Sequence, residues 1–453
     1  MKNKIVGIFV CIILIAASLP VIGAVAIEIK NEKNTTNSEI NTMTSNALDE
    51  GWLEEIDGVK VLHLNGSYYE MGYQYGYLLK KEIEENYRGI LNLADAEEYN
   101  HWLEKWNTIF KYYIPQDYIE EMQGLADGSG IPINDVYVVN FGWAFIIGEV
   151  GCSDFVSWGP ATFDGKLYQM HSEDDTNIID PETGTSVRDN QVLIVSKPDN
   201  RYASLYTALA GLVTGLDGIN EKGISISQSI STTNDYTYHG IDCMIQIRMV
   251  LDHASSATEG IEILKQNRTG GNLFIISDGK IPVAFVCEQT ANLMYVGSWD
   301  DRVEGKDPFW QISHVLRRKN FFIHPLLAST QRFNYNPKRF VSPIAKLFGR
   351  NEYYDWWRFY RTISKEIEKL WGNLDLNNTI SLIRSVYRGE TDLLLRFWKA
   401  GEFVPPYHQW VACPETGDMA ICFGTTEKSA QYNPIHYFNL FDLLNSKPYN
   451  SFN

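Results

Sequence analysis

Basic residues are scarce in this chain of 453 residues. It has 39 lysines and arginines against 56 aspartates and glutamates, which gives a formal net charge of −17 at pH 7. Proteins that bind nucleic acid neutralise phosphates with clustered basic side chains, so the composition argues against nucleic acid as a partner. The chain also lacks a G-x-S-x-G elbow, an H-E-x-x-H pair, a P-loop and a dinucleotide fingerprint. We therefore expect no cofactor and no metal.

Cysteine is the second residue type in short supply, with six copies. None of the six forms a CxxC pair, so a zinc ribbon or a thioredoxin-type site is not supported. Cys11 lies in the N-terminal apolar segment, and the odd number that remains leaves at least one thiol free. Cys413 and Cys422 flank a turn-like Pro-Glu-Thr-Gly-Asp segment and could be cross-strand neighbours that form a disulfide.

Long apolar runs are confined to the N-terminus, where residues 1–26 predict a signal peptide or a membrane anchor. Lysines at positions 2 and 4 precede an unbroken apolar run over residues 5–26, which ends in the small-x-small pattern of a cleavage site. Left uncleaved, the run is long enough to span a bilayer and to hold the protein at a membrane. Either alternative predicts a secreted or cell-envelope protein. Residues 27–51 are a polar spacer.

The rest of the chain alternates between helical and β patterns. We predict a mainly helical N-terminal part over residues 52–151, a core over residues 152–430 and a C-terminal tail over residues 431–453. A capping box begins the first helix at Ser67, and β patterns begin at Ser153. Strands followed by helices and then by strands again predict an α+β fold with layers of helix, sheet, sheet and helix.

Cys152 stands at the start of the first β pattern of the core. If the Asp164-Gly165 turn sets the register of the first hairpin, Asp174 faces Phe155 and lies near Cys152. A thiol at a strand start would then face polar groups that could orient or activate it. Two other interpretations stay open: a buried cysteine that only packs, and, for residues 171–175, a solvated acidic loop or a hard-cation site.

Several segments resemble, in order, the acyl-coenzyme A:6-aminopenicillanic acid acyltransferase family, which is grouped with the cysteine N-terminal-nucleophile hydrolases. The matching segments are Gly66-Ser-Tyr-Tyr-Glu-Met-Gly-Tyr-Gln-Tyr-Gly76, Gly151-Cys-Ser-Asp-Phe155, Asp164-Gly-Lys-Leu-Tyr168, Gly218-Ile-Asn-Glu-Lys-Gly-Ile-Ser-Ile-Ser227, Arg248-Met-Val-Leu-Asp252 and Asn272-Leu-Phe-Ile-Ile-Ser-Asp278. The resemblance implies a four-layer αββα sandwich of the N-terminal-nucleophile hydrolase type.

The same resemblance implies a precursor that cleaves itself between Gly151 and Cys152, with the two chains staying associated. Cys152 would then be the nucleophile of an amidohydrolase or acyltransferase acting on linear C–N amide bonds, or on thioesters, of a small molecule. The new α-amino group would serve as general base, because its pKa lies near 8. Glycine at position 151 removes side-chain bulk next to the thiol.

The resemblance implies further site residues, although this sequence departs from the family's motifs around them. The family's Arg-Asn-x-Asp run corresponds to residues 171–174, so Asp174 keeps the carboxylate and His171 replaces an arginine with a group of pH-dependent charge. Asn320 resembles the asparagine of the family's Thr-Asn-His-Phe segment and is expected to act in catalysis, although it could merely cap a helix. Ser229 and Asn220 are further candidates for contacts with the oxyanion or the substrate.

Two alternatives to an amide-cleaving enzyme stay open. The Cys-Ser and His-Ser pairs at positions 152–153 and 171–172 bear some likeness to a phospholipase B-like acyl hydrolase. The departures from the family's arginine and asparagine positions also allow an inactive envelope or binding protein that keeps the fold.

Overall fold

The computed structural model describes residues 50–146, 151–174, 177–332, 354–397 and 405–448. The predicted signal or anchor, residues 1–26, lies outside these ranges, as does most of the predicted spacer. Among the described residues, no helix combines the length and the apolar character that a membrane crossing requires. Residues 43–453 cluster as one compact unit, and the fold described below is that of this unit.

Strands of the described residues form two sheets. The nine-stranded sheet has the order β1 (Trp52–Ile56), β2 (Val59–Gly66), β5 (Gln191–Pro198), β6 (Ser204–Leu209), β7 (Asp217–Asn220), β8 (Ile224–Ile230), β9 (Asn272–Asp278), β10 (Val283–Gln289) and β11 (Met294–Gly297). The six-stranded sheet has the order β12 (Val315–Lys319), β3 (Gly151–Gly159), β4 (Gly165–Asp174), β13 (Pro406–Cys413), β14 (Asp418–Phe423) and β15 (His436–Asn439). All neighbours pair antiparallel except β2 and β5, which are parallel.

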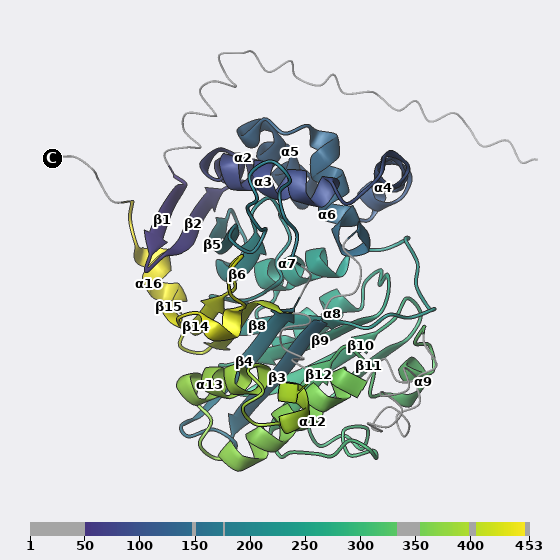
Figure 1. Cartoon of the computed structure of the whole chain (residues 1–453), viewed down its shortest axis with the longest axis vertical. Helices are drawn as coiled ribbons and strands as arrows, with labels where there is room; N and C mark the ends of the chain where they lie inside the picture. The colour runs from purple at the N-terminus through teal and green to yellow at the C-terminus, as the bar shows by residue number, and fades with distance from the viewer. Residues whose placement is uncertain (1–49, 147–150, 175–176, 333–353, 398–404, 449–453) are drawn as a thin grey trace, which may run out of the picture. The chain divides into compact units, whose positions relative to one another are not determined.

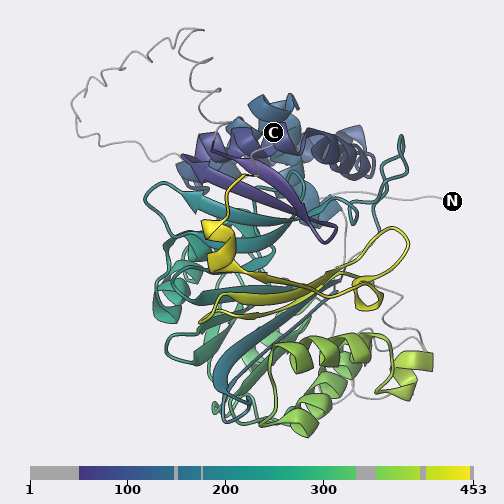
Figure 2. The ribbon, with the colours of Figure 1, turned by 90° about the vertical axis from the view of Figure 1, so that its left-hand side faces the viewer.

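The two sheets pack face to face, because each presents an apolar inner face to the other. Leu193 and Ile219 of the nine-stranded sheet share a buried cluster with Trp410 and Ile421 of the six-stranded one. A second cluster joins the strands around β3 and β9. Both faces of β3 are therefore covered, and every position of this strand except its last is buried. Figure 2 shows the two sheets stacked between helices.

Helices cover both outer faces. The nine-stranded sheet carries α2 (Tyr68–Leu78), α3 (Lys80–Leu91), α4 (Ala96–Thr108), α5 (Gln116–Ser129), α6 (Ile133–Ile146), α7 (Cys243–His253) and α8 (Ala257–Leu264). The six-stranded sheet carries α12 (Tyr354–Leu370) and α13 (Leu376–Tyr387), and shorter helices are α9 (Pro325–Ala328), α14 (Leu393–Phe397) and α16 (Leu440–Asn445). In Figure 1 the purple helices and the green helices lie at opposite ends of the molecule. The predicted order of helix, sheet, sheet and helix is confirmed.

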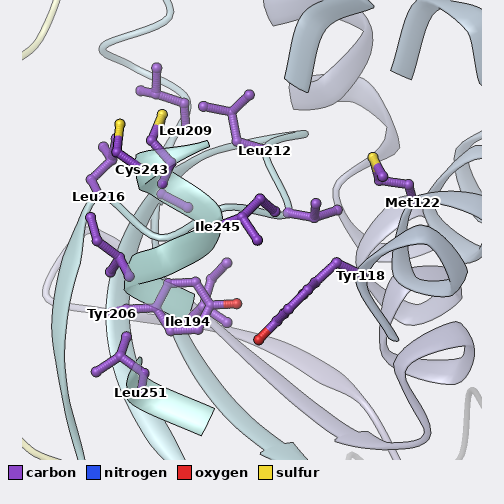
Figure 3. Close-up of a cluster of buried hydrophobic side chains, with 14 of the residues drawn as sticks. Tyr118, Met122, Ile194, Tyr206, Leu209, Leu212, Leu216, Cys243, Ile245 and Leu251 are labelled. Atoms are coloured by element: carbon purple, nitrogen blue, oxygen red, sulfur yellow. The ribbon is translucent and has the colours of Figure 1, made fainter. Parts of the chain in front are cut away.

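The largest buried cluster fills the space between the nine-stranded sheet and its helices. Figure 3 shows Tyr118 of α5 reaching toward Tyr206 of β6 and Ile245 of α7. The Tyr118 and Tyr68 hydroxyls both donate to the Asp252 carboxylate at the end of α7, at 3.0 and 2.8 Å. The helical N-terminal part is thus fixed to the core by apolar packing and by buried hydrogen bonds.

Close helix packing explains the glycines of the first family-like segment. Ser67 caps α2 with the predicted capping box. A Cβ on Gly72 of this helix would lie 2.0 Å from the backbone oxygen of Glu121 in α5, and one on Gly124 of α5 would lie 2.1 Å from that of Tyr69. Only glycine lets the two backbones approach this closely, so the segment is needed for packing rather than for chemistry.

Two segments differ from the sequence-based expectation. The mainly helical part over residues 52–151 begins with two strands, β1 and β2, that extend the nine-stranded sheet. Residues 431–453, expected to be a tail, supply strand β15 and helix α16, and Leu440 and Leu443 are buried against both sheets. Strands β1 and β15 were missed because alternation over five or four residues is a weak signal.

All five cysteines of the described residues are free thiols. The disulfide considered for Cys413 and Cys422 is therefore wrong. The β13–β14 register pairs Cys413 with Asp418 and Cys422 with Gln409, so the two thiols stand at different positions along the hairpin.

Candidate active site

Cys152 is the second residue of β3 and is buried, with 1% of its surface exposed. Its strand neighbour on β4 is Glu173, while Asp174 pairs with Gly151. The predicted register, with Asp174 opposite Phe155, is wrong. The turn is not a two-residue one: the ladder ends at the pair Gly159 and Gly165, and it is irregular just before that pair. The carboxylate opposite the thiol is consequently Glu173.

Asn320 directly contacts the backbone of Cys152. It follows β12, whose last residue Lys319 pairs with Ser153. The Asn320 side-chain oxygen accepts the backbone N–H of Cys152 at 2.9 Å, and its nitrogen donates to the Ile230 carbonyl at 3.0 Å. The side chain is thereby held in one orientation against the bond between Gly151 and Cys152. The structure thus brings together Cys152 and Asn320, which were both predicted to act in catalysis.

The thiol of Cys152 has a carboxylate within reach. Its Sγ donates to Oε2 of Glu173 at 3.4 Å, and the same oxygen lies 3.4 Å from Nε2 of His171. Burial and the carboxylates of Glu173, Asp154 and Asp174 raise the pKa of the Cys152 thiol well above its ordinary value. This environment therefore favours the neutral thiol, which needs a base to release its proton.

His171 lies in the middle of a buried row of ionisable groups. Its Nδ1 is 2.5 Å from Oδ2 of Asp217, which also accepts from Nε2 of His408 at 2.8 Å. On its other side Nε2 lies 3.8 Å from Asp154. Burial opposes the charge of His171, but Asp154, Asp217 and Glu173 outweigh it and raise the pKa to about 10. The surrounding carboxylates therefore favour the charged form of His171.

Asp217 is the shared acceptor of this row. Burial works against its ionisation, but the charges and hydrogen bonds of His408 and His171 prevail and lower its pKa. The Thr207 hydroxyl donates to its other oxygen at 2.6 Å. Residues 171–174 belong to strand β4, with His171, Ser172 and Asp174 buried, so the interpretation of this run as a solvated loop is wrong. The interpretation as a hard-cation site stays a hypothesis. Asp175 lies outside the described residues.

Asp174 is directed toward a lysine rather than toward the thiol. Its Oδ2 accepts from the Tyr387 hydroxyl at 2.5 Å and from Nζ of Lys319 at 3.3 Å, and its Oδ1 accepts from Ser172 at 2.7 Å. Lys319 also donates to the Ser153 hydroxyl at 3.0 Å. Asp174 and Lys319 therefore form a buried pair beneath the backbone that carries the thiol.

The other two candidates lie farther from the chemistry. Ser229, at the end of β8, donates to Asp154 and so contacts the row of ionisable groups through that carboxylate. Asn220 does not join the site: its side chain binds the backbone of Lys222 and Ile224 in the turn after β7, and the carbonyls of α7. The prediction of Asn220 as an oxyanion or substrate contact is thus not supported by its position.

Removing the charge of Asp174 should destabilise the fold. Asp174→Asn is expected to lower the free energy of unfolding by about 3–5 kcal/mol, because it leaves the buried Lys319 without its counter-charge. Chemical denaturation measures the change. The double variant Asp174→Leu/Lys319→Met, which removes both charges, should regain most of the loss. An unchanged denaturation midpoint for Asp174→Asn would show that the pair does not contribute to stability.

A known protein family matches the middle of the chain, a segment that includes His171 and Glu173 but neither Cys152 nor Asn320. Residues 163–294 match the model of the acyl-coenzyme A:6-aminopenicillanic acid acyl-transferase family. The resemblance inferred from the sequence is confirmed over this segment, which includes β4, β8 and the residues from His171 to Asp217. The layers described above form the four-layer αββα sandwich that the resemblance implied.

Curated relatives match the chain over part of their length. An uncharacterised protein from Archaeoglobus fulgidus is 26% identical over 264 residues, which is 51% of this chain and 43% of that protein. Protein dcd1B from Dictyostelium discoideum is 23% identical over 235 residues, or 46% of this chain and 45% of that protein. The chain thus matches less than half the length of either relative.

Two solved structures are also similar. Penicillin V acylase from Agrobacterium tumefaciens is 12% identical with a TM-score of 0.38, over 64% of this chain and 86% of that one. A variant of conjugated bile acid hydrolase from Clostridium perfringens is 16% identical with a TM-score of 0.38, over 64% of this chain and 93% of that one.

Proposed function

We propose that this protein is an exported, self-processing cysteine enzyme that cleaves or transfers an acyl group at a non-peptide amide or a thioester. The observation that carries the proposal is the surroundings of Cys152: a thiol beside the Glu173 carboxylate, on a residue whose backbone N–H is bound by Asn320. The match to an acyl-transferase family supports the reaction class. Export rests on the signal-like residues 1–26.

Self-cleavage requires a base that exists before cleavage. In the uncleaved chain the nitrogen of Cys152 is a peptide nitrogen and cannot accept the thiol proton. Glu173 can, because its carboxylate already accepts the S–H. Sγ then attacks the Gly151 carbonyl, the bond from that carbon to the nitrogen of Cys152 breaks, and this nitrogen takes up the proton. Water hydrolyses the resulting thioester and leaves a free carboxylate on Gly151 and a free thiol on Cys152.

The second reaction uses the group that the first one creates. The α-amine of Cys152 has an ordinary pKa near 8, so it can take the thiol proton at neutral pH. The thiolate attacks the substrate carbonyl, the leaving amine or thiol takes the proton, and an acyl-enzyme forms on Sγ. Water or an acceptor amine then releases the acyl group. Asn320 keeps the α-amine beside the thiol through the contact that it makes with the peptide N–H.

The experiment that tests this function traps the acyl-enzyme. Purified protein is incubated with a panel of acyl-amides and acyl thioesters, quenched in acid, digested and analysed by mass spectrometry. We expect the peptide that begins with Cys152 to gain the mass of the acyl group for at least one substrate. Turnover of ester-linked lipid without amide cleavage would favour the phospholipase B-like alternative. No acylation, together with an uncleaved chain, would favour an inactive binding protein.

A further inference from the structure

Three side chains at the N-terminal end of β3 and the facing end of β4 bring ligand atoms for a soft metal ion to one point. They are Sγ of Cys152, Nε2 of His171 and Oε2 of Glu173, and these atoms all lie within 4.8 Å of one another. The glutamate oxygen is 3.4 Å from the sulfur and 3.4 Å from the histidine nitrogen. Thiolate, imidazole and carboxylate are the three ligand types that zinc prefers.

The spacing fits a tetrahedral ion. Zinc binds sulfur at about 2.3 Å and nitrogen or oxygen at about 2.0–2.2 Å, so two ligand atoms of one tetrahedral site stand about 3.3–3.6 Å apart. The two measured separations of 3.4 Å fall in this range. The third pair of ligand atoms, Sγ of Cys152 and Nε2 of His171, lies within 4.8 Å.

The orientation of His171 is the second, independent observation. Its side chain is fully buried, and Nε2 makes no hydrogen bond within the described part of the chain, where it faces the carboxylates of Glu173 at 3.4 Å and Asp154 at 3.8 Å. Its Nδ1 is held by Asp217 at 2.5 Å. A carboxylate on one ring nitrogen with the other nitrogen left for the ion is the usual arrangement around metal-binding histidines, since it fixes the ring and raises its basicity.

The charges around these three ligand atoms also favour the binding of a cation. Glu173 and Asp154 face it from β4 and β3, and Asp217 stands behind His171. His408 lies beyond Asp217, and Lys319 is engaged by Asp174 on the neighbouring side. A bound ion would displace the proton of the Cys152 thiol and the proton on Nε2 of His171, and both protons would pass to solvent. The positive charge of the ion would then balance the negative charges of the nearby carboxylates.

We propose that the uncleaved chain binds one Zn²⁺ ion through Cys152 Sγ, His171 Nε2 and Glu173 Oε2, with water as the fourth ligand. The metal-bound sulfur cannot attack the Gly151 carbonyl, and Glu173 cannot accept its proton. The ion therefore holds the precursor inactive until it is removed, a consequence that rests on the proposed self-cleavage.

Native mass spectrometry of the full chain tests the site. The chain is expressed and purified with added zinc or with a chelator, and the spectrum reports the zinc content of cleaved and uncleaved protein separately. We expect one zinc per uncleaved chain, slow cleavage with zinc, and cleavage once the chelator is added. Cobalt in place of zinc should give a thiolate-to-cobalt absorption band, which reports the sulfur ligand directly.

Variants separate binding from folding. Cys152→Ala should lose the cobalt band and bind zinc about 100-fold more weakly or worse, and Asp217→Asn should weaken binding about 10–100-fold through the orientation of His171. Cys243→Ala, a buried thiol on α7, is the matched control and should bind zinc normally. Zinc-free uncleaved protein, or equal affinity for Cys152→Ala, would overturn the site. If the chain remains uncleaved in chelator, the proposed self-cleavage is contradicted. The cobalt band still shows whether Cys152 binds the metal.

Discussion

Cys152→Ala is expected to abolish both self-cleavage and acyl transfer. Removing the nucleophile of an enzyme that works through a covalent intermediate lowers kcat on the order of 10⁶-fold. The substitution removes one sulfur from a buried position, and Cys152 makes its fixed hydrogen bond to Asn320 through the backbone, so the fold should survive. Steady-state kinetics on the best substrate of the acyl panel measures the loss, and circular dichroism checks the fold.

Cys243→Ala is the matched control for this variant, because it too removes a buried free thiol. It should retain cleavage and activity. If Cys152→Ala hydrolyses the same substrate at a rate close to that of the unaltered protein, the nucleophile lies elsewhere and the assignment fails.

Glu173→Gln is expected to slow self-cleavage about 10²–10⁴-fold, the usual contribution of a general base. Glutamine keeps the size of the side chain but cannot take the thiol proton. The rate is measured in chelator, from the fraction of uncleaved chain over time by mass spectrometry, so that a bound metal cannot affect it. Glu173→Gln protein that has eventually been cleaved should lose less in turnover rate than in cleavage rate, because the α-amine of Cys152 then serves as the base.

Glu182→Gln is the control for this substitution. Its side chain is 70% exposed and pairs with Arg88, away from the thiol, so cleavage should proceed normally. Cleavage of Glu173→Gln at the unaltered rate would show that another group accepts the proton in the precursor.

The proximity of the proposed nucleophile and Asn320 could be anticipated from the sequence because each residue belongs to a local pattern. Cys152 stands where a β pattern begins, and Asn320 lies within a segment that resembles the family. The wrong register shows the limit of this reasoning. Asp164-Gly165 looks like a two-residue turn, but the strands separate before it, at Gly159. A change of register exchanges the residue opposite the thiol, and so Glu173 was not recognised as the neighbour of Cys152.

The residues behind the site could not be predicted, because they come from strands far apart in the sequence. Asp217 and His408 are separated by 191 residues and meet only where the two sheets pack. Lys319 and Tyr387 come from β12 and α13. One signal was present for Asp217, which stands in the otherwise apolar segment over residues 211–219, where a buried charge requires a partner. The sequence does not say which partner that is.

The central claim is that Cys152 becomes the first residue of a processed chain and acts there as the nucleophile. The most direct measurement is the intact mass of the chains of protein purified without zinc, with N-terminal sequencing of the larger chain. The account predicts two associated chains, the larger beginning at Cys152, and a single chain for Cys152→Ala. An unaltered protein with the bond between Gly151 and Cys152 intact in chelator, or one cut at another position, would contradict it.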